Sequence, residues 1–139
     1  MTTRNLYKHR WKPALLRRRF IPSLVSAATA VTMSGPSSGT VLVASTNFTV
    51  GANGAITGTV VVTPSDGGAG GTFTPTTVSI SSGSPTGTFT YTPATTGVKT
   101  ISVTNDGGLS NPSNISYTSN ASGGVVGANF FRYIAKLGV

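Results

Sequence analysis

The feature that most limits the fold of this chain is a series of short Thr-, Ser- and Val-rich segments that begins at Thr29. Polar and apolar residues alternate within these segments, with the period of two that is typical of half-buried β-strands. Turn-forming sequences such as Gly35-Pro36 and Asp106-Gly107-Gly108 separate the segments. The pattern predicts an all-β chain whose antiparallel strands pack as a sandwich.

About seven strands are expected from this pattern. Their predicted ranges are 29–34, 40–43 with 47–50, 56–63, 72–74 with 77–81, 86–92, 98–104 and 114–118. The side chains that would point inward are apolar or aromatic, and they are Phe48, Val50, Val60, Val62, Val78, Ile80, Phe89, Tyr91, Ile101, Val103, Ile115 and Tyr117. They would fill the space between two sheets. Phe89 and Tyr91 could also be a sugar-stacking platform, but aromatic residues on one face of a central strand favour the core.

Positive charge is concentrated at the N-terminus. The net charge of +8 comes from 10 Lys and Arg residues against two acids. Seven of the cations lie in the first nineteen residues, and they are Arg4, Lys8, Arg10, Lys12, Arg17, Arg18 and Arg19. Because the middle of the chain is almost uncharged, we predict three regions: a basic anchoring arm over 1–27, the sandwich over 28–120 and an apolar docking tail over 121–139.

The arm also carries apolar residues that could anchor it, namely Trp11, Leu15, Leu16 and Phe20. Pro13 and Pro22 limit any helix there to a short segment. We expect the cations and these apolar residues to bind an acidic protein surface together, with the apolar side chains buried as anchors. Binding of the arm to nucleic acid, with aromatic rings stacked on bases, is an open alternative.

An export leader is the other open interpretation of the same segment. Arg17-Arg18-Arg19-Phe20-Ile21 resembles a twin-arginine motif, and Ala28-Thr29-Ala30 resembles a signal-peptidase site. The apolar stretch between them falls short of the about 7–15 residues of a leader, which favours a retained arm. No run approaches the roughly 20 apolar residues of a transmembrane helix, so no membrane span is expected.

A second candidate anchor lies at the C-terminus. Two glycines at 123–124 precede a dense apolar cluster composed of Phe130, Phe131, Tyr133, Ile134 and Leu137. Phe130, Ile134 and Leu137 would share one face of a short helix. Since such a helix is marginal alone in water, we expect it to dock on its own sandwich or on a partner.

The sequence contains few residues that could act as catalytic groups or metal ligands. It has no cysteine, and His9 is its single histidine. Asp66 and Asp106 both stand in Asp-Gly-Gly sequences, which turn formation explains. Lys99 lies at the start of a predicted strand, and no serine is marked as its nucleophilic partner. We therefore predict no catalytic residue, no cofactor and no metal, and a protein that is not an enzyme.

The hairpin over 87–103 resembles the penultimate hairpin of the immunoglobulin-like (Ig-like) repeat modules of bacteria and phages. It reads GTFTYTPATTGVKTISV, with an aromatic strand, a proline-containing corner, a glycine and a returning strand. The resemblance extends over about 31–117 and specifies a fold better than a function. It implies one Ig-like antiparallel β-sandwich without catalysis, as in phage decoration, capsid and tail proteins and bacterial surface adhesins.

A single module with two flanking segments predicts assembly rather than an adhesin array. We therefore expect a non-enzymatic virion structural protein, either a capsid decoration or cement protein or a head or tail accessory protein. Its partners would be the major capsid or tail subunits of the same particle. We also expect a multi-copy homo-oligomer, whose copies would share weak individual contacts. The alternative is an exported bacterial Ig-like adhesion or binding module at the cell surface.

Overall fold

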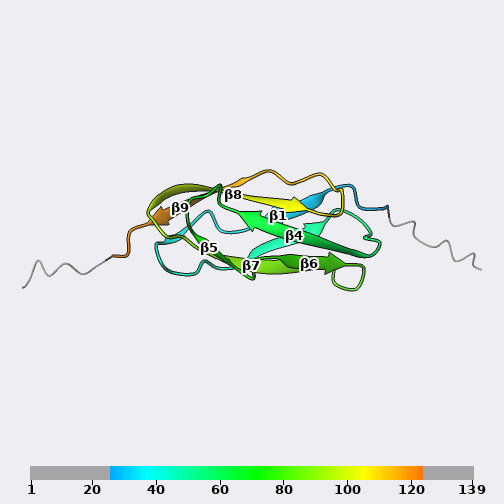
Figure 1. The fold of residues 1–139 in the computed structure, drawn as a ribbon, viewed down its shortest axis with the longest axis horizontal. Helices are drawn as coiled ribbons and strands as arrows, with labels where there is room; N and C mark the ends of the chain where they lie inside the picture. The colour runs from blue at the N-terminus through cyan, green and yellow to red at the C-terminus, as the bar shows by residue number, and fades with distance from the viewer. Residues whose placement is uncertain (1–25, 124–139) are drawn as a thin grey trace, which may run out of the picture.

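The computed structural model describes residues 26–123, which form two packed β-sheets (Figure 1). The strands are β1 Val31–Ser34, β2 Ser38–Thr40, β3 Phe48–Ala52, β4 Thr59–Ser65, β5 Thr72–Thr74, β6 Val78–Ser81, β7 Thr86–Thr92, β8 Gly97–Asn105 and β9 Ile115–Asn120. One sheet has the order β1-β3-β7-β5 and the other the order β2-β9-β8-β4-β6. The predicted all-β class and the two-sheet architecture are confirmed. The arm before residue 26 and the tail after residue 123 lie outside the described residues.

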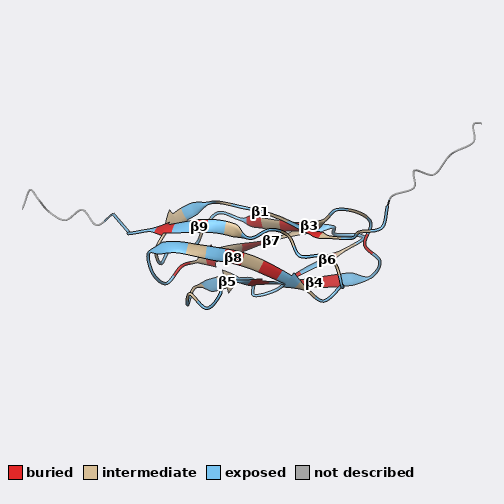
Figure 2. Ribbon diagram, turned by 90° about the horizontal axis from the view of Figure 1, so that it is seen from above, coloured by how far each residue is buried: buried red, intermediate tan, exposed pale blue. Residues whose placement is uncertain are grey.

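The core follows the predicted alternation. Buried residues alternate with partly buried and exposed ones along the strands (Figure 2). All predicted inward side chains are buried except Ile115, which is partly buried and packs against the core. Val31 and Ile56 also belong to the core, although the predicted phasing did not include them. Phe89 and Tyr91 are 1% and 0% exposed, so the prediction that they are core residues rather than a sugar platform is confirmed.

Every connection between consecutive strands crosses between the sheets except β8–β9, so β7 and β8, which the sequence predicted as a hairpin, lie in different sheets. β1 pairs with β3 in the four-stranded sheet, whereas β2 pairs with β9 in the five-stranded sheet. Further along, β5 pairs with β7 and β6 pairs with β4, so these two strands also lie in different sheets. The β2–β9 pair is parallel and the other strand pairs are antiparallel. The segments 72–74 and 77–81, which the sequence grouped as one of about seven strands, are therefore two strands in separate sheets, and residues 26–123 form nine strands.

The predicted strand over 40–43 is wrong. β2 ends at Thr40, and Val41, Leu42 and Val43 form a turn in which Val43 N–H donates to the Thr40 carbonyl at 3.2 Å. The chain must cross here from the five-stranded sheet to β3 in the other sheet, and a straight strand cannot make that crossing. Leu42 takes a φ of 60°, and its side chain is 74% exposed. An apolar run was therefore mistaken for a buried strand.

Aromatic rings fill the centre of the sandwich. Phe48 stacks on Phe89 with ring centroids 5.1 Å apart and planes 4° apart. Tyr91 meets Tyr117 edge to face at 5.4 Å. Both geometries are favoured by aromatic quadrupoles and add to the gain from burial. Because the chain has no cysteine, this packing stabilises the sandwich without a disulfide.

Asp66 organises the turn between β4 and β5. Its carboxylate accepts hydrogen bonds from the N–H groups of Gly68, Ala69 and Gly71 at 3.1, 3.1 and 2.8 Å, and from the Tyr91 hydroxyl at 3.0 Å. Burial alone would raise the pKa of Asp66, but these four hydrogen bonds together lower it below its ordinary value. The stability that the lowered pKa contributes is present above the carboxyl's ordinary pKa and is lost as pH falls through the folded-state value.

The two buried tyrosines are expected to respond oppositely to loss of their hydroxyls. Tyr91→Phe removes a donor to the Asp66 carboxylate and should lower the free energy of unfolding by about 1.5–3 kcal/mol. The Tyr117 hydroxyl is buried and has no hydrogen-bond partner among the described residues, so Tyr117→Phe should leave stability unchanged or raise it. Urea unfolding of both variants at neutral pH measures the difference. Equal losses in the two variants would contradict these hydrogen-bond assignments.

Candidate functional site

The predicted partner-binding residues belong to the arm and the tail, outside the described residues 26–123. They are Arg4, Lys8, Arg10, Trp11, Lys12, Leu15, Leu16, Arg17, Arg18, Arg19 and Phe20 in the arm, and Phe130, Phe131, Tyr133, Ile134 and Leu137 in the tail. The structure does describe the last residues of the arm, from Ser26, and the chain just after β9. It therefore shows where both segments join the sandwich.

The two joining points lie at opposite ends of the sandwich (Figure 1). We call one end the N-terminal pole, formed by residues 26–30, the β3–β4 loop and the β8–β9 loop. The C-terminal pole is formed by the turn 41–43, the β7–β8 turn and the end of β9. β3 and β8 both run from the C-terminal pole to the N-terminal pole, and β9 runs back.

Residues 26–30, which join the arm to β1 and which we call the arm base, are hydrogen-bonded to the two loops of the N-terminal pole. The side-chain oxygen of Asn53 accepts from the N–H groups of Thr29 and Ala30 at 2.9 and 3.1 Å. Its amide nitrogen donates to the Thr29 hydroxyl at 2.9 Å. On the other side, Ser110 N–H donates to the Thr29 carbonyl at 3.0 Å. The arm base is thus held between the β3–β4 and β8–β9 loops.

Backbone pairing continues outward to Ser26. Ala55 N–H donates to the Ser26 carbonyl and Ala28 N–H donates to the Ala55 carbonyl, both at 2.8 Å. Gly54 permits this close approach, since a Cβ on it would lie 2.5 Å from the Ser26 carbonyl oxygen and 2.9 Å from the backbone of Ala27. These contacts fix the direction in which the chain enters the sandwich.

Loss of the Asn53 side chain should loosen this attachment. Asn53→Ala removes three hydrogen bonds, and we expect a loss of about 1–3 kcal/mol in the free energy of unfolding. Amide hydrogen exchange at Thr29 and Ala30 should accelerate more than exchange in β7 and β8. Asn53→Asp is the matched control, because it keeps the acceptor and loses only the donor to Thr29. Exchange in Asn53→Ala that is unchanged at residues 29–30 would contradict the assignment.

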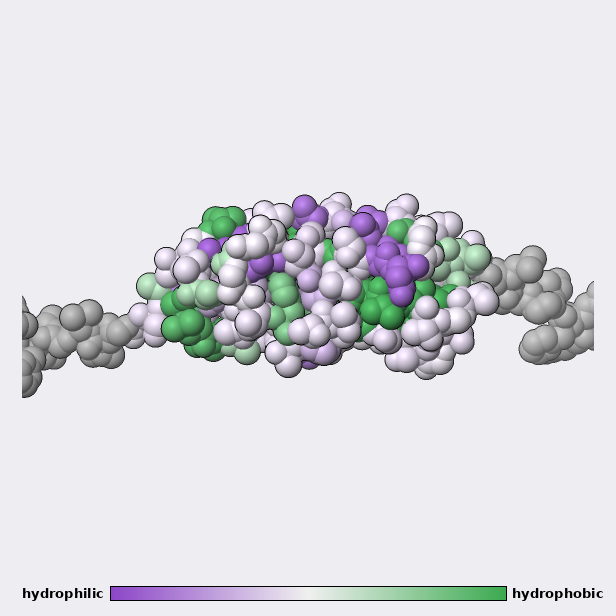
Figure 3. All heavy atoms as spheres, viewed as in Figure 1, coloured by the Kyte–Doolittle hydropathy of each residue, from purple (hydrophilic) through white to green (hydrophobic). Residues whose placement is uncertain are grey.

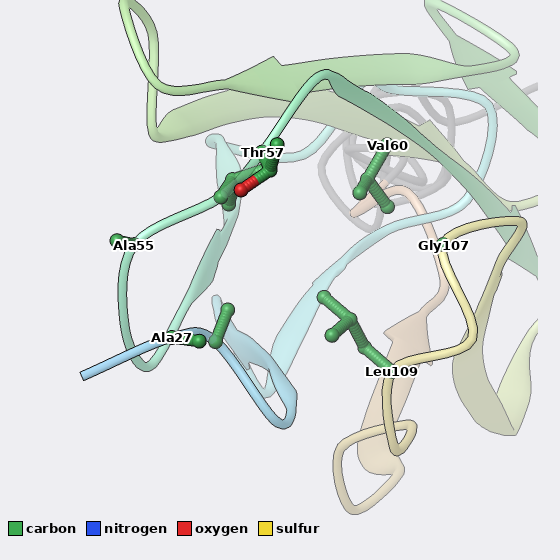
Figure 4. A pocket seen from close by; sticks show the side chains of 8 residues that line it. Ala27, Ala55, Thr57, Val60, Gly107 and Leu109 are labelled. Carbon is green, nitrogen blue, oxygen red and sulfur yellow. The ribbon is translucent and has the colours of Figure 1, made fainter.

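A small pocket opens beside the arm base. It has a volume of about 190 Å³ and is lined by Ala27, Ala28, Ala55, Ile56, Thr57, Val60, Gly107 and Leu109. Val60 and Leu109 reach into the space from one side, and Ala27, Ala55 and Thr57 border it from the other (Figure 4). The lining carries no ionisable side chain. Because backbone groups also reach the lining, the pocket offers both polar and apolar contacts to a small group.

The ionisable side chains of the sandwich have structural contacts. Asp66 holds its turn, as described above, and Asp106 accepts from Val61 N–H at 2.7 Å. Lys99 donates to the Thr95 hydroxyl at 2.8 Å and to the Thr96 carbonyl at 3.2 Å. Among residues 26–123, no His, Asp or Glu side chains gather in a group of three that could hold a metal ion. The predicted turn role agrees with the contacts of Asp66, whereas Asp106 links its turn to β4, and the Asn105 side chain accepts from the N–H groups of Gly107 and Leu109 within that turn.

Sequence reasoning missed Asn53 and the pocket. Asn53-Gly54 was visible only as a turn signal, because its role depends on a segment more than twenty residues earlier in the chain. The pocket likewise joins residues from three separate stretches. The chain matches no protein-family model and no curated protein sequence. The part of the chain that the structure describes includes no helix long and apolar enough to cross a membrane.

Proposed function

We propose that this protein is a non-enzymatic structural component of a phage-like virion, in which an Ig-like sandwich is held on the particle by the basic arm and the apolar tail. The strand order supports the Ig-like part of the proposal. When β1, β3, β4, β5, β7, β8 and β9 are named A to G, the sheets read A-B-E-D and G-F-C, the order of Ig constant-type domains. β2 and β6 then add one edge strand each to the second sheet.

The observation that carries the proposal is that the arm base is part of the fold. Asn53 and Ser110 bind Thr29 and Ala30, and Ala55 pairs with Ser26. Cleavage after Ala30, as the export interpretation requires, would remove all these partners and leave the Asn53 side chain without them. If the arm is retained, the same contacts connect the sandwich firmly to an arm that is bound to the particle.

The distribution of charge supports a division of labour between sandwich and arm. Residues 28–120 carry only Lys99 against Asp66 and Asp106. Asp66 and Lys99 bind groups in their own turns, and Asp106 accepts a hydrogen bond from Val61 N–H on β4. The face of the sandwich shown in Figure 3 is mostly weakly polar, with a few hydrophobic patches. Attraction to an acidic partner would therefore come from the arm, where seven cations steer and align it.

The proposed mechanism is cementing. Ordering the arm on a neighbouring subunit costs conformational entropy, and burial of Trp11, Leu15, Leu16 and Phe20 offsets that cost. Fully extended, the arm would reach roughly 80–90 Å, enough to cross a subunit boundary. Many copies on one particle would add up contacts that are individually weak.

The test is binding to the native particle by the full chain and by a chain that begins at Ser26. Starting at Ser26 preserves the pairing with Ala55, so loss of folding does not confound the comparison. We expect the shortened chain to have the same urea unfolding midpoint as the full chain and to lose particle binding. Undiminished binding would contradict the anchoring role. Binding that disappears only when the particle is emptied of its genome would identify nucleic acid as the arm's partner instead.

A further inference from the structure

The C-terminal pole has an exposed leucine in an unfavourable backbone conformation. Leu42 has a φ of 60°, in the left-handed region that glycine and asparagine usually occupy. Its N–H donates to the Pro93 carbonyl at 2.9 Å, which holds this geometry in place. The side chain is nevertheless 74% exposed, and that of Val43 is 54% exposed. Packing within the sandwich therefore does not explain a leucine at this position.

The opposite pole has a small pocket whose lining side chains are mostly aliphatic. The pocket has a volume of about 190 Å³, and aliphatic side chains, glycine and one threonine line it, with no charged group. An engineered apolar cavity of about 150 Å³ is large enough for benzene, so this pocket has room for the isobutyl group of a leucine. Knob and pocket lie at opposite ends of one molecule, so they cannot meet within it.

We propose that Leu42 of one copy inserts into the N-terminal-pole pocket of the next copy. A knob at one pole and a pocket at the other make a heterologous contact, which joins copies head to tail. The contact brings together the tail base of one copy and the arm base of its neighbour. It involves sandwich residues and Ala27, the last residue of the arm, and does not depend on the partner of the arm.

The expected contact is weak in isolation. One leucine and its neighbours bury far less than the roughly 800 Å² per partner of a standard interface. Head-to-tail pairing would therefore be populated chiefly where copies are held close together, as on the surface of a particle. A covalent trap that accumulates transient pairs is the appropriate assay.

The absence of native cysteine permits such a trap. Val43→Cys places a thiol beside an intact Leu42, and Thr57→Cys places one at the exposed rim of the pocket. The two variants of the full chain are mixed under mild oxidation, and mixed disulfide dimers are quantified by mass. Thr88→Cys, an exposed threonine on the outer face of the four-stranded sheet, replaces Thr57→Cys in the control mixture.

We expect the mixture of Val43→Cys with Thr57→Cys to form dimers at least about tenfold faster than the control mixture. Adding Leu42→Asn to the Val43→Cys chain should remove this excess. Asparagine tolerates the left-handed conformation, so the unfolding midpoint of this variant should stay the same or rise. The double variant Val43→Cys/Thr57→Cys should give a ladder of multimers.

Equal dimer formation in the two mixtures would overturn the proposal. So would an excess that survives Leu42→Asn, because the leucine would then not be the inserted group. Predominance of Val43→Cys homodimers would indicate a two-fold symmetric contact between C-terminal poles instead. Each of these results leaves the particle-binding test of the arm unaffected.

Discussion

Phe48→Ala should lower the free energy of unfolding by about 3–5 kcal/mol, the largest loss that we expect from a single truncation in this sandwich. Phe48 is 0% exposed, stacks on Phe89 and lies 6.0 Å from Tyr117 between ring centroids. Its ring also fills the space directly above the Gly35 backbone. Since domains of this size are stable by only about 5–15 kcal/mol, the variant should be close to unfolding at room temperature.

Phe73→Ala is the matched control. Phe73 lies on the short edge strand β5 and is only partly buried. Its ring centroid lies 5.7 Å from that of Phe89 and 4.8 Å from that of Tyr91. The same chemical change should therefore cost clearly less there. Urea unfolding measures the free energy of unfolding of both variants. A smaller loss of this free energy for Phe48→Ala than for Phe73→Ala would contradict the placement of the core between these sheets.

Simultaneous replacement of Trp11 and Phe20 by alanine should weaken particle binding by roughly 1,000-fold. Buried aromatic anchors at interfaces contribute about 2 kcal/mol or more each when truncated, which corresponds to roughly thirtyfold per residue. The urea midpoint of the sandwich should not change, because its stability comes from packing within residues 26–123. The measurement is the dissociation constant for the native particle at physiological salt.

Replacement of Arg17, Arg18 and Arg19 by glutamine separates the role of charge from that of the anchors. It should chiefly slow association and flatten the dependence of binding on salt, because rim charges steer encounter more than they hold the complex. A charge variant that loses all binding while the aromatic variant retains it would contradict the proposed burial of aromatic anchors.

The strands that the sequence predicted best are those in which local pattern and tertiary environment agree. β7 was predicted at its observed bounds, because 86–92 alternates strictly and turn-forming sequences flank it. Phe89 and Tyr91 were likewise assigned to the buried face, since two large aromatic residues two positions apart have few other stable places in a sandwich. Composition and periodicity determine this much of the fold.

What the sequence did not reveal depends on contacts between distant segments. Val41-Leu42-Val43 has the composition of a strand, but the need to change sheets turns it into an exposed turn. Asn53 and Gly54 bind the arm base only because the β3–β4 loop and residues 26–30 meet at one pole. The contacts of Asn53 and Gly54 with the arm base could therefore not be derived from the spacing of residues along the chain.

We propose that the arm stays attached to the sandwich and anchors it to the particle. The most direct measurement is the intact mass of the protein recovered from its native particle. A mass that includes the residues before Ser26 is the expected result, because the fold uses Ser26 to Ala30 as part of its N-terminal pole. A mature chain that begins near Val31 would contradict the claim and favour an exported module.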